Sequence, residues 1–239
     1  MKKSIVLNEN QKILRKRLIE ILYNLKSSHI GSCFNTIDLI DSVYSIKNKN
    51  DKFILSCGHA ALAFYVVLEK YKFLKNTDLK SLYLHPDRNK KIGIEVSSGS
   101  LGLGLPISVG MAIANRENKI YCLISDGECA EGSIWESFRI IQDLKIKNIR
   151  IIITANGWGA YGPISLENLK KRIEGFGFKI LEIDGHNKEE INNSLKVISE
   201  MDILFARTNS EQLPFLKGLD AHYYIMNERD YQVAMDILK

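Results

Sequence analysis

The chain has 239 residues, of which 45% are hydrophobic and 26% are charged, and its formal net charge is +5. This length can bury a sizeable core, and these proportions are ordinary for a soluble globular protein. No apolar run approaches the roughly 18 residues of a membrane-spanning helix, and the basic residues are spread along the chain rather than gathered. We therefore expect no membrane insertion and no binding to nucleic acid.

The N-terminus turns polar at residues 8–10, which is too early for a secretory signal. Four cysteines are present, at positions Cys33, Cys57, Cys122 and Cys129. They form no CxxC motif, and two of them lie in or beside apolar, strand-like runs. We interpret them as reduced core thiols of a cytoplasmic protein.

Hydrophobic periodicity predicts three helices and one short strand in the first third of the chain. We place the helices at residues 8–26, 36–47 and 60–71 and the strand at residues 53–56. Asn35 or Thr36 is suited to be the N-cap of the second helix. The polar segment 76–95 predicts a loop with one helical turn.

From residue 99 onward, predicted helices and strands alternate. The helices fall at residues 105–115, 133–143, 165–175 and 188–200, and the strands at residues 119–124, 149–154, 179–183 and 202–207. This alternation predicts an α/β fold, a parallel β-sheet flanked by helices on both faces. We expect a single domain over residues 1–239, in which residues 208–239 form a loop and a final helix that reaches a partner.

Two of the predicted strands end in polar groups. The run Ser125-Asp126-Gly127-Glu128 follows one of them, and Asn156 follows the next, 30 residues after Asp126. In parallel sheets, ligands bind at the carboxyl ends of the strands. A carboxylate, an amide oxygen and a nearby backbone carbonyl suit Mg²⁺, which takes few protein ligands together with a phosphate. Gly127 lets the backbone approach such a phosphate closely.

A glycine-rich turn, Gly99-Ser100-Leu101-Gly102-Leu103-Gly104, opens the helix predicted at residues 105–115. Taken alone it is weak support for a phosphate site, and a dinucleotide-binding fingerprint is the alternative. The turn follows no clear strand, however, and no acidic ribose ligand stands at a suitable spacing. Both facts argue against a dinucleotide.

These motifs resemble the thiamine-diphosphate-binding domain of the transketolase family over about residues 10–225. The Glu131-Gly132 and Trp135-Glu136 pairs also match that family. The resemblance implies thiamine diphosphate with Mg²⁺ (or Ca²⁺ or Mn²⁺) as cofactors and implies a metal held by Asp126, Asn156 and the Trp158 backbone carbonyl. The cofactor contacts that it implies are His59, Gly99, Leu101, Asp126, Gly127, Glu131 and Asn156.

Four of the five histidines fall at active-site positions of this family, namely His29, His59, His85 and His222. A structural role is more common for any single histidine, but four matches in order make it improbable for the set. The resemblance implies that these imidazoles accept a hydroxyl proton of a ketose or bind sugar oxygens. His186 is interpreted as a structural turn residue. Glu131 is implied to act in catalysis from a subunit interface, where it bonds toward the activating glutamate of a partner.

The transketolase family also needs a pyrimidine domain, for which this chain has no room. The resemblance therefore implies the N-terminal subunit of a split transketolase, which transfers a two-carbon ketol unit between sugar phosphates. Such a chain would be active only with a separate pyrimidine-domain subunit, in an α₂β₂ heterotetramer.

Two alternatives stay open. One is the corresponding subunit of a 2-oxoacid decarboxylase or dehydrogenase, although these enzymes usually lack the set of histidines. The other is a non-catalytic binding subunit, because this chain departs from the family pattern at Ser125, at Thr154-Ala155 and at residues 209–212.

Overall fold

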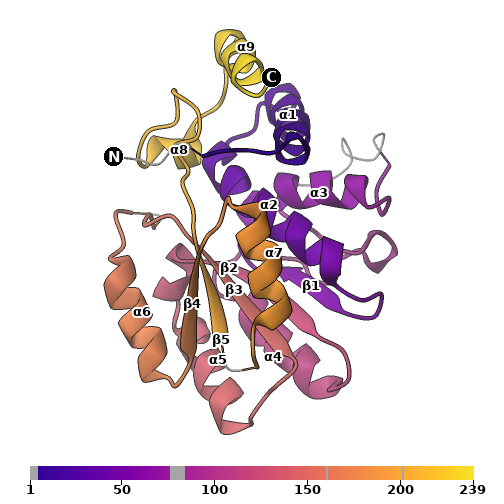
Figure 1. Ribbon diagram of the computed structural model, residues 1–239, viewed down its shortest axis with the longest axis vertical. Coiled ribbons are helices and arrows are strands. Elements are labelled where there is room, and N and C mark those ends of the chain that lie inside the picture. Colours follow the sequence, from indigo (N-terminus) through magenta and orange to yellow (C-terminus); the bar gives the residue numbers. More distant parts are fainter. Residues whose placement is uncertain (1–4, 76–83, 160, 201) are drawn as a thin grey trace.

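Five parallel strands form one sheet at the centre of the molecule (Figure 1). The computed structural model describes residues 5–75, 84–159, 161–200 and 202–239. The strands are β1 (Lys52–Leu55), β2 (Ile120–Ser125), β3 (Ile149–Ala155), β4 (Lys179–Asp184) and β5 (Asp202–Arg207). Their order across the sheet is β1-β2-β3-β5-β4, and every neighbouring pair is parallel. The predicted α/β fold is confirmed.

Successive side chains of the central strands enter two different hydrophobic cores, because a strand alternates its faces. In β2, Tyr121 and Leu123 pack into one core, whereas Ile120, Cys122 and Ile124 pack into the other. All of these side chains are buried, so the strand is hydrophobic throughout, as expected for a parallel sheet covered on both faces.

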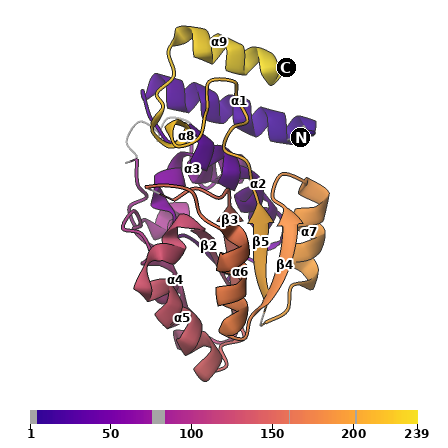
Figure 2. The ribbon, with the colours of Figure 1, turned by 90° about the vertical axis from the view of Figure 1, so that its left-hand side faces the viewer.

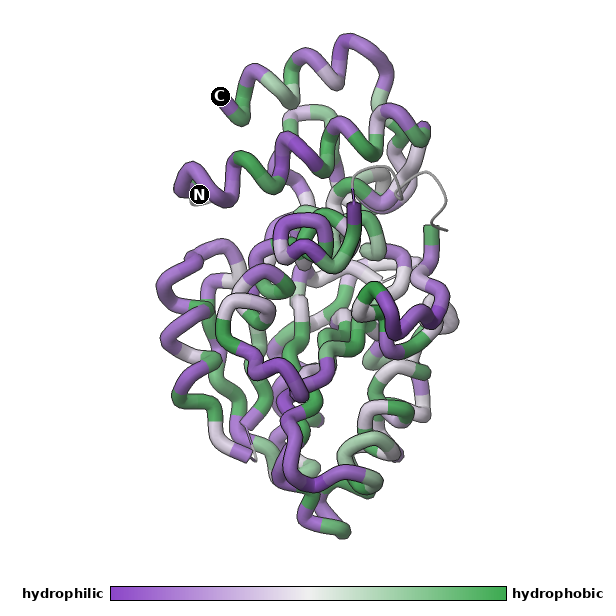
Figure 3. Tube along the Cα trace, turned by 90° about the vertical axis from the view of Figure 1, so that its right-hand side faces the viewer, coloured by the Kyte–Doolittle hydropathy of each residue, from purple (hydrophilic) through white to green (hydrophobic). Residues whose placement is uncertain are grey.

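Helices cover both faces of the sheet. The first core is closed by α1 (Glu9–Asn24), α2 (Ile30–Ile46), α3 (Ala61–Lys70) and α7 (Lys188–Val197), and the second by α4 (Gly104–Ala114), α5 (Gly132–Asp143) and α6 (Leu166–Gly175). Figure 2 shows α4, α5 and α6 together, with α7 on the other side of β4 and β5. Figure 3 shows hydrophobic residues alternating with hydrophilic ones along the helices nearest the two termini.

The second helix begins earlier than its sequence predicts. It starts at Ile30 rather than at residue 36, after His29 in a left-handed conformation with φ 69°. The N–H of His29 donates to the carbonyl of His222, a contact 193 residues away along the chain that local sequence could not reveal. The predicted N-cap role of Asn35 or Thr36 is therefore wrong, and both residues lie buried inside the helix.

The C-terminal segment returns to the first helix. It contains the short helix α8 (Asp220–Tyr223) and the helix α9 (Glu228–Ile237), and α9 lies beside α1 in Figures 1 and 2. Tyr231 of α9 stacks on Tyr23 of α1 with ring centroids 4.6 Å apart. The predicted final helix is present and packs against this chain's own N-terminal helix.

The polar segment predicted as a loop falls partly outside the described residues, at 76–83. Its described part contains the 3-10 turn η3 (Lys90–Ile92), which is the single helical turn expected there. No helix in the described part of the chain is long and apolar enough to span a membrane. All four cysteines are free and buried, as predicted.

A buried ion pair joins α1 to α2. The guanidinium of Arg15 binds both carboxylate oxygens of Asp38, at 2.9 and 2.6 Å, and both side chains are 0% exposed. Burial opposes the charge on Asp38, but Arg15 lowers the pKa of this carboxyl below its ordinary value. His186 lies within 3.3 Å of Asp38 and accepts the N–H of Asn209 through Nε2, so it has the structural role that the sequence predicts.

Replacing Arg15 with Ala should lower the free energy of unfolding by about 3–5 kcal/mol, because it leaves the Asp38 carboxylate buried without its cation. Urea denaturation at pH 7 measures this loss. Arg139→Ala is the matched control, because it breaks exposed ion pairs with Glu136 and Asp143 and should change stability little. Equal losses for the two variants would contradict the role assigned to the buried pair.

Candidate functional site

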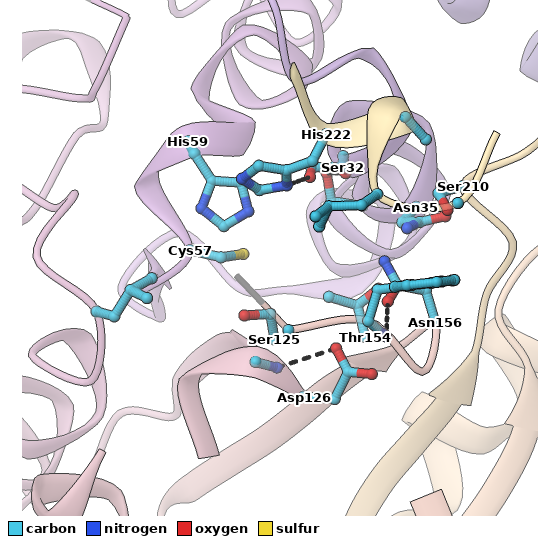
Figure 4. Close-up of a pocket in the computed structure, with 18 residues that line it drawn as sticks. Ser32, Asn35, Cys57, His59, Ser125, Asp126, Thr154, Asn156, Ser210 and His222 are labelled. Atoms are coloured by element: carbon cyan, nitrogen blue, oxygen red, sulfur yellow. Dashed lines mark hydrogen bonds between the residues drawn. The ribbon is translucent and has the colours of Figure 1, made fainter. Parts of the chain in front are cut away.

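A cleft lies at the carboxyl-terminal edge of the sheet, where β1, β2 and β3 end beside one another (Figure 4). Eighteen residues line it, and the space between them, including its opening to solvent, is about 710 Å³. The cleft therefore lies where a parallel sheet is expected to bind its ligand.

The residues that end β2 and β3 form the floor of the cleft. The carboxylate of Asp126 is 2% exposed and accepts the backbone N–H groups of Gly127, at 3.0 Å, and of Gly157, at 2.7 Å. The amide oxygen of Asn156 accepts the N–H of Trp158 at 2.7 Å. These bonds hold the Asp126 carboxylate and the Asn156 amide on adjoining loops, as the sequence predicted.

The donor set on this floor fits a hard divalent cation. Burial raises the pKa of Asp126 to about 7, although the backbone N–H groups that bind its oxygens lower it in part. Among the described residues, no cationic side chain forms an ion pair with this carboxylate. A buried carboxylate of this kind is stabilised by a metal ion. The carbonyl oxygen of Trp158 lies close to Gly127, 3.7 Å from where a Cβ on that glycine would stand.

The protein would supply few ligands to such a cation. Among the described residues, no group of three or more His, Cys, Asp or Glu side chains is placed to hold a metal. Asp126, Asn156 and the Trp158 carbonyl would thus leave the remaining positions to water and to the ligand's own oxygens, which is the usual arrangement for Mg²⁺ with a phosphate.

A second buried carboxylate braces the cleft. Glu128 is 0% exposed and accepts hydrogen bonds from the Ser56 hydroxyl at 2.6 Å, the Gly102 N–H at 3.0 Å, the Ser125 N–H at 2.9 Å and the Ser125 hydroxyl at 3.5 Å. These donors come from the end of β1, the glycine-rich turn and the end of β2. Burial raises the pKa of Glu128, and its donors oppose that shift. No pattern in the sequence indicated this role.

The glycine-rich turn packs against two of the predicted site residues. Gly99 has φ 145° and lies against the ring of His85, and Gly102 has φ 77° and lies against the side chain of Glu131. A Cβ at Gly99 or Gly102 would stand 2.8 Å or 2.6 Å from those side chains, so only glycine fits. Residues 84–98 before the turn contain no strand, which agrees with the rejection of a dinucleotide fingerprint.

Three imidazole rings gather at the other end of the cleft. His29 precedes α2, His59 lies in the 3-10 turn η1 (Gly58–Ala60), and His222 lies in α8. Their ring centroids are 4.5 Å apart for His29 and His222, 5.1 Å for His59 and His222, and 5.4 Å for His29 and His59. Tertiary structure thus brings together three histidines that the sequence placed far apart.

These rings are held neutral at pH 7. Burial, with the nearby His222 and His85, lowers the pKa of His29 to about 4, and burial with the neighbouring imidazoles lowers that of His59 to about 3. Burial also lowers the pKa of His222. The Nδ1 atoms of His29 and His222 lie 2.6 Å from the Ser28 hydroxyl and 3.3 Å from the Ser32 hydroxyl, which leaves each Nε2 available for a ligand.

Not every predicted site residue lines the cleft. Leu101 does, whereas Gly99 and the exposed His85 are not among the lining residues, and Glu131 is exposed at the start of α5. His29 is not a lining residue either, and it lies behind the cleft against the rings of His59 and His222. The interface role of Glu131 stays a prediction. Sequence reasoning missed several lining residues, among them Ser32, Asn35, Thr36, Cys57, Thr154 and Ser210. The first three share a helical spacing, but the predicted helix began too late to reveal it.

Comparisons with known proteins agree with this geometry. Residues 12–202 match the family model of the transketolase thiamine diphosphate binding domain. One of the subunits of apulose-4-phosphate transketolase from Phocaeicola vulgatus is 31% identical over 252 residues, which cover 92% of this chain and 89% of that protein. The subunit of the same name from Actinobacillus succinogenes is 26% identical over 98% of this chain and 96% of its own.

Longer transketolases are similar over only part of their length. Human transketolase is 35% identical over 158 residues, which are 59% of this chain and 25% of that protein. The crystal structure of transketolase from Campylobacter jejuni is similar with a TM-score of 0.84 and 27% identity, over 96% of this chain and 42% of its own. The chain therefore spans about a quarter of the human protein and less than half of the solved one.

Acidification should destabilise the protein through its buried histidines. The pKa values of His29 and His59 are lower in the folded chain than in the unfolded one, so protonation of these rings favours unfolding. The free energy of unfolding should therefore have its full value above about pH 6.5 and fall as the pH drops toward 4. Urea denaturation at pH 7, 6 and 5 measures this decline, and His59→Asn should make it shallower. Imidazole NMR signals of His29 and His59 that titrate near pH 6.5 would contradict the assignment.

Replacing Glu128 with Gln should lower the free energy of unfolding by about 1–3 kcal/mol, because one buried donor loses its acceptor and faces an amide N–H instead. Thermal and urea denaturation measure the loss. Glu136→Gln on the exposed side of α5 is the control and should have little effect. An unchanged stability of the Glu128 variant would show that the three segments are held by other contacts.

Proposed function

The chain belongs to the transketolase family through its thiamine-diphosphate-binding domain, and on that premise we propose that it is the N-terminal subunit of a two-component transketolase. It would transfer a two-carbon ketol unit from a ketose to an aldose, with thiamine diphosphate and Mg²⁺ as cofactors. The observation that carries the proposal is that the two ends of the cleft differ in chemistry. Asp126 and Asn156 on the floor offer oxygen ligands for a cation, and a cluster of neutral imidazoles lies opposite them.

The floor would hold the diphosphate and its metal. Asp126, Asn156 and the Trp158 carbonyl are the proposed metal ligands, and Gly127 and Leu101 are proposed to contact the cofactor. Bound thiamine diphosphate supplies the nucleophilic carbon and the electron sink for cleaving the carbon–carbon bond of the ketose. The protein's task at this end is to neutralise and orient the anionic group.

The imidazoles would handle protons. As the donor's carbon–carbon bond breaks, its hydroxyl loses a proton, and a neutral imidazole can accept it. His29 and His222 are suited to this step through Nε2, because serine hydroxyls occupy the Nδ1 side of each ring. His59 and His85 are proposed to bind sugar or cofactor oxygens beside them. This set distinguishes the site from a 2-oxoacid decarboxylase, whose substrate has no hydroxyl to deprotonate.

A partner subunit would complete the site. Two relatives that this chain nearly spans are named as subunits, whereas single-chain transketolases are much longer. The missing part would bind the aminopyrimidine and supply the activating glutamate, with Glu131 facing it from the surface beside Gly102. We propose an α₂β₂ heterotetramer. The cytoplasmic location stays a prediction.

The donor is proposed to be a phosphorylated ketose. The two relatives that are named as subunits are named for apulose 4-phosphate, and this compound is therefore the first donor to test. Xylulose 5-phosphate with ribose 5-phosphate is the comparison, and preference for apulose 4-phosphate would place the chain in a specialised sugar pathway.

Calorimetric titration of thiamine diphosphate and Mg²⁺ tests the proposal. We expect tight binding only when the chain is mixed with a pyrimidine-domain subunit, and at least a roughly 100-fold loss with Asp126→Ala, because the metal loses its only charged ligand. Omitting Mg²⁺ should have the same effect. The matched control is Asp143→Ala, an exposed carboxylate on the far end of α5.

Three outcomes would contradict parts of the proposal. Full ketol transfer by the isolated chain would exclude the need for a partner. Turnover of a 2-oxoacid without activity on any ketose would favour the decarboxylase alternative. Absence of cofactor binding in every mixture would favour a non-catalytic binding subunit.

A further inference from the structure

Asn35 is a buried polar side chain without a partner in the described part of this chain. It is 1% exposed, and neither its Nδ2 nor its Oδ1 has a hydrogen bond among the described residues. Buried amides are almost always hydrogen-bonded, so an orphaned one calls for a physical reason. Asn35 is also one of the residues that line the cleft, which supplies such a reason.

The position of Asn35 on its helix turns its side chain into the cleft. Ser32, Asn35 and Thr36 are spaced i, i+3 and i+4, so they share one face of α2, and all three line the cleft. The hydroxyl of Ser32 contacts the ring of His222, and Asn35 follows one helical turn further on. In the view of Figure 4, Asn35, Ser210 and Asn156 are drawn on one side of the cleft and His59 on the other.

Local structure does not use this amide. Because α2 begins at Ile30, Asn35 cannot serve as an N-cap, which is the role its side chain usually fills. The neighbouring Thr36 differs, since its hydroxyl donates to the carbonyls of Ser32 and Cys33 within the helix. An unpaired buried amide destabilises the folded chain, so its presence indicates a partner that arrives from outside.

The charge of the cleft indicates which partner this is. None of the described residues that line it is Lys or Arg, its imidazoles are neutral, and its one carboxylate is Asp126. An anionic group bound here must therefore be met by a metal ion and by uncharged donors. An amide NH₂ is such a donor, and hydrogen bonds to a charged acceptor are stronger than those between neutral groups.

We infer that the Nδ2 amide of Asn35 donates a hydrogen bond to the diphosphate of the bound cofactor. This inference rests on the proposed function and adds to it a ligand-binding residue on α2 that neither motif contains. The amide would bind the anion in place of a cationic side chain, since none of the described lining residues is Lys or Arg. The bound diphosphate would supply the hydrogen-bond partner that Asn35 lacks within the chain.

The test compares Asn35→Leu, which keeps the branched shape and the number of heavy atoms of the side chain, with the unaltered chain. Two probes are titrated in the presence of Mg²⁺, inorganic pyrophosphate against the chain alone and thiamine diphosphate against the mixture with its partner. We expect Kd to rise roughly 10- to 100-fold for both probes. We expect the melting temperature without ligand to rise or stay level, because the variant removes a buried unpaired amide.

Ser42→Ala is the matched control. Ser42 lies on the same helix, is 0% exposed and has a hydroxyl without a hydrogen bond among the described residues, but it does not line the cleft. This variant should leave both Kd values unchanged. Asn35→Asp should bind more weakly than Asn35→Leu, because its carboxylate repels the anion.

The outcomes separate the inference from the proposed function. If the unaltered chain binds the probes and Asn35→Leu binds them equally well, the inference is overturned while the proposed function stands. A lower melting temperature with unchanged Kd would likewise overturn it, by showing a purely structural role. If the unaltered chain binds neither probe in any mixture, the proposed function fails and the inference fails with it.

Discussion

The buried carboxylate of Glu128 holds together three segments that are distant in the sequence. It accepts donors from Ser56 at the end of β1, from Gly102 in the glycine-rich turn and from Ser125 at the end of β2. An ionised carboxylate without solvent is tolerated only when such donors surround it. The ends of β1 and β2 and the glycine-rich turn must therefore meet as they do, and the cleft is shaped before any ligand enters.

The second buried carboxylate, Asp126, lines the cleft itself. It accepts two backbone N–H groups, and burial raises its pKa to about 7. The unpaired amide of Asn35 lines the same cleft. The fold thus places one buried carboxylate behind the cleft as a brace and leaves a second carboxylate and an unpaired amide facing the space where a ligand would bind.

The imidazole end is organised by a different physical constraint. His29, His59 and His222 lie in three separate segments, and their rings approach one another closely. Burial and repulsion between the imidazoles lower the pKa values of His29 and His59, and burial lowers that of His222. Neutral rings can accept protons, whereas the oxygen ligands of the floor suit a metal ion, so the two ends are suited to different steps. The N–H bond from His29 to the carbonyl of His222 links the start of α2 to α8, and hence connects the C-terminal segment to the site.

The sequence by itself determined the alternation of strands and helices, the pairing of Asp126 with Asn156 and the identity of the clustered histidines. The first two follow from local hydrophobic period and from motifs at strand ends, whereas the histidines were identified by their resemblance to active-site positions of the transketolase family. Neither route needs knowledge of distant contacts. Only tertiary structure decided where α2 begins, because the His222 carbonyl that receives the His29 N–H is 193 residues away. For the same reason only tertiary structure could show that Glu128 is a brace and that Asn35 is not a helix cap but an unpaired amide in the cleft. Each of those roles is set by atoms from other segments, and no local pattern encodes them.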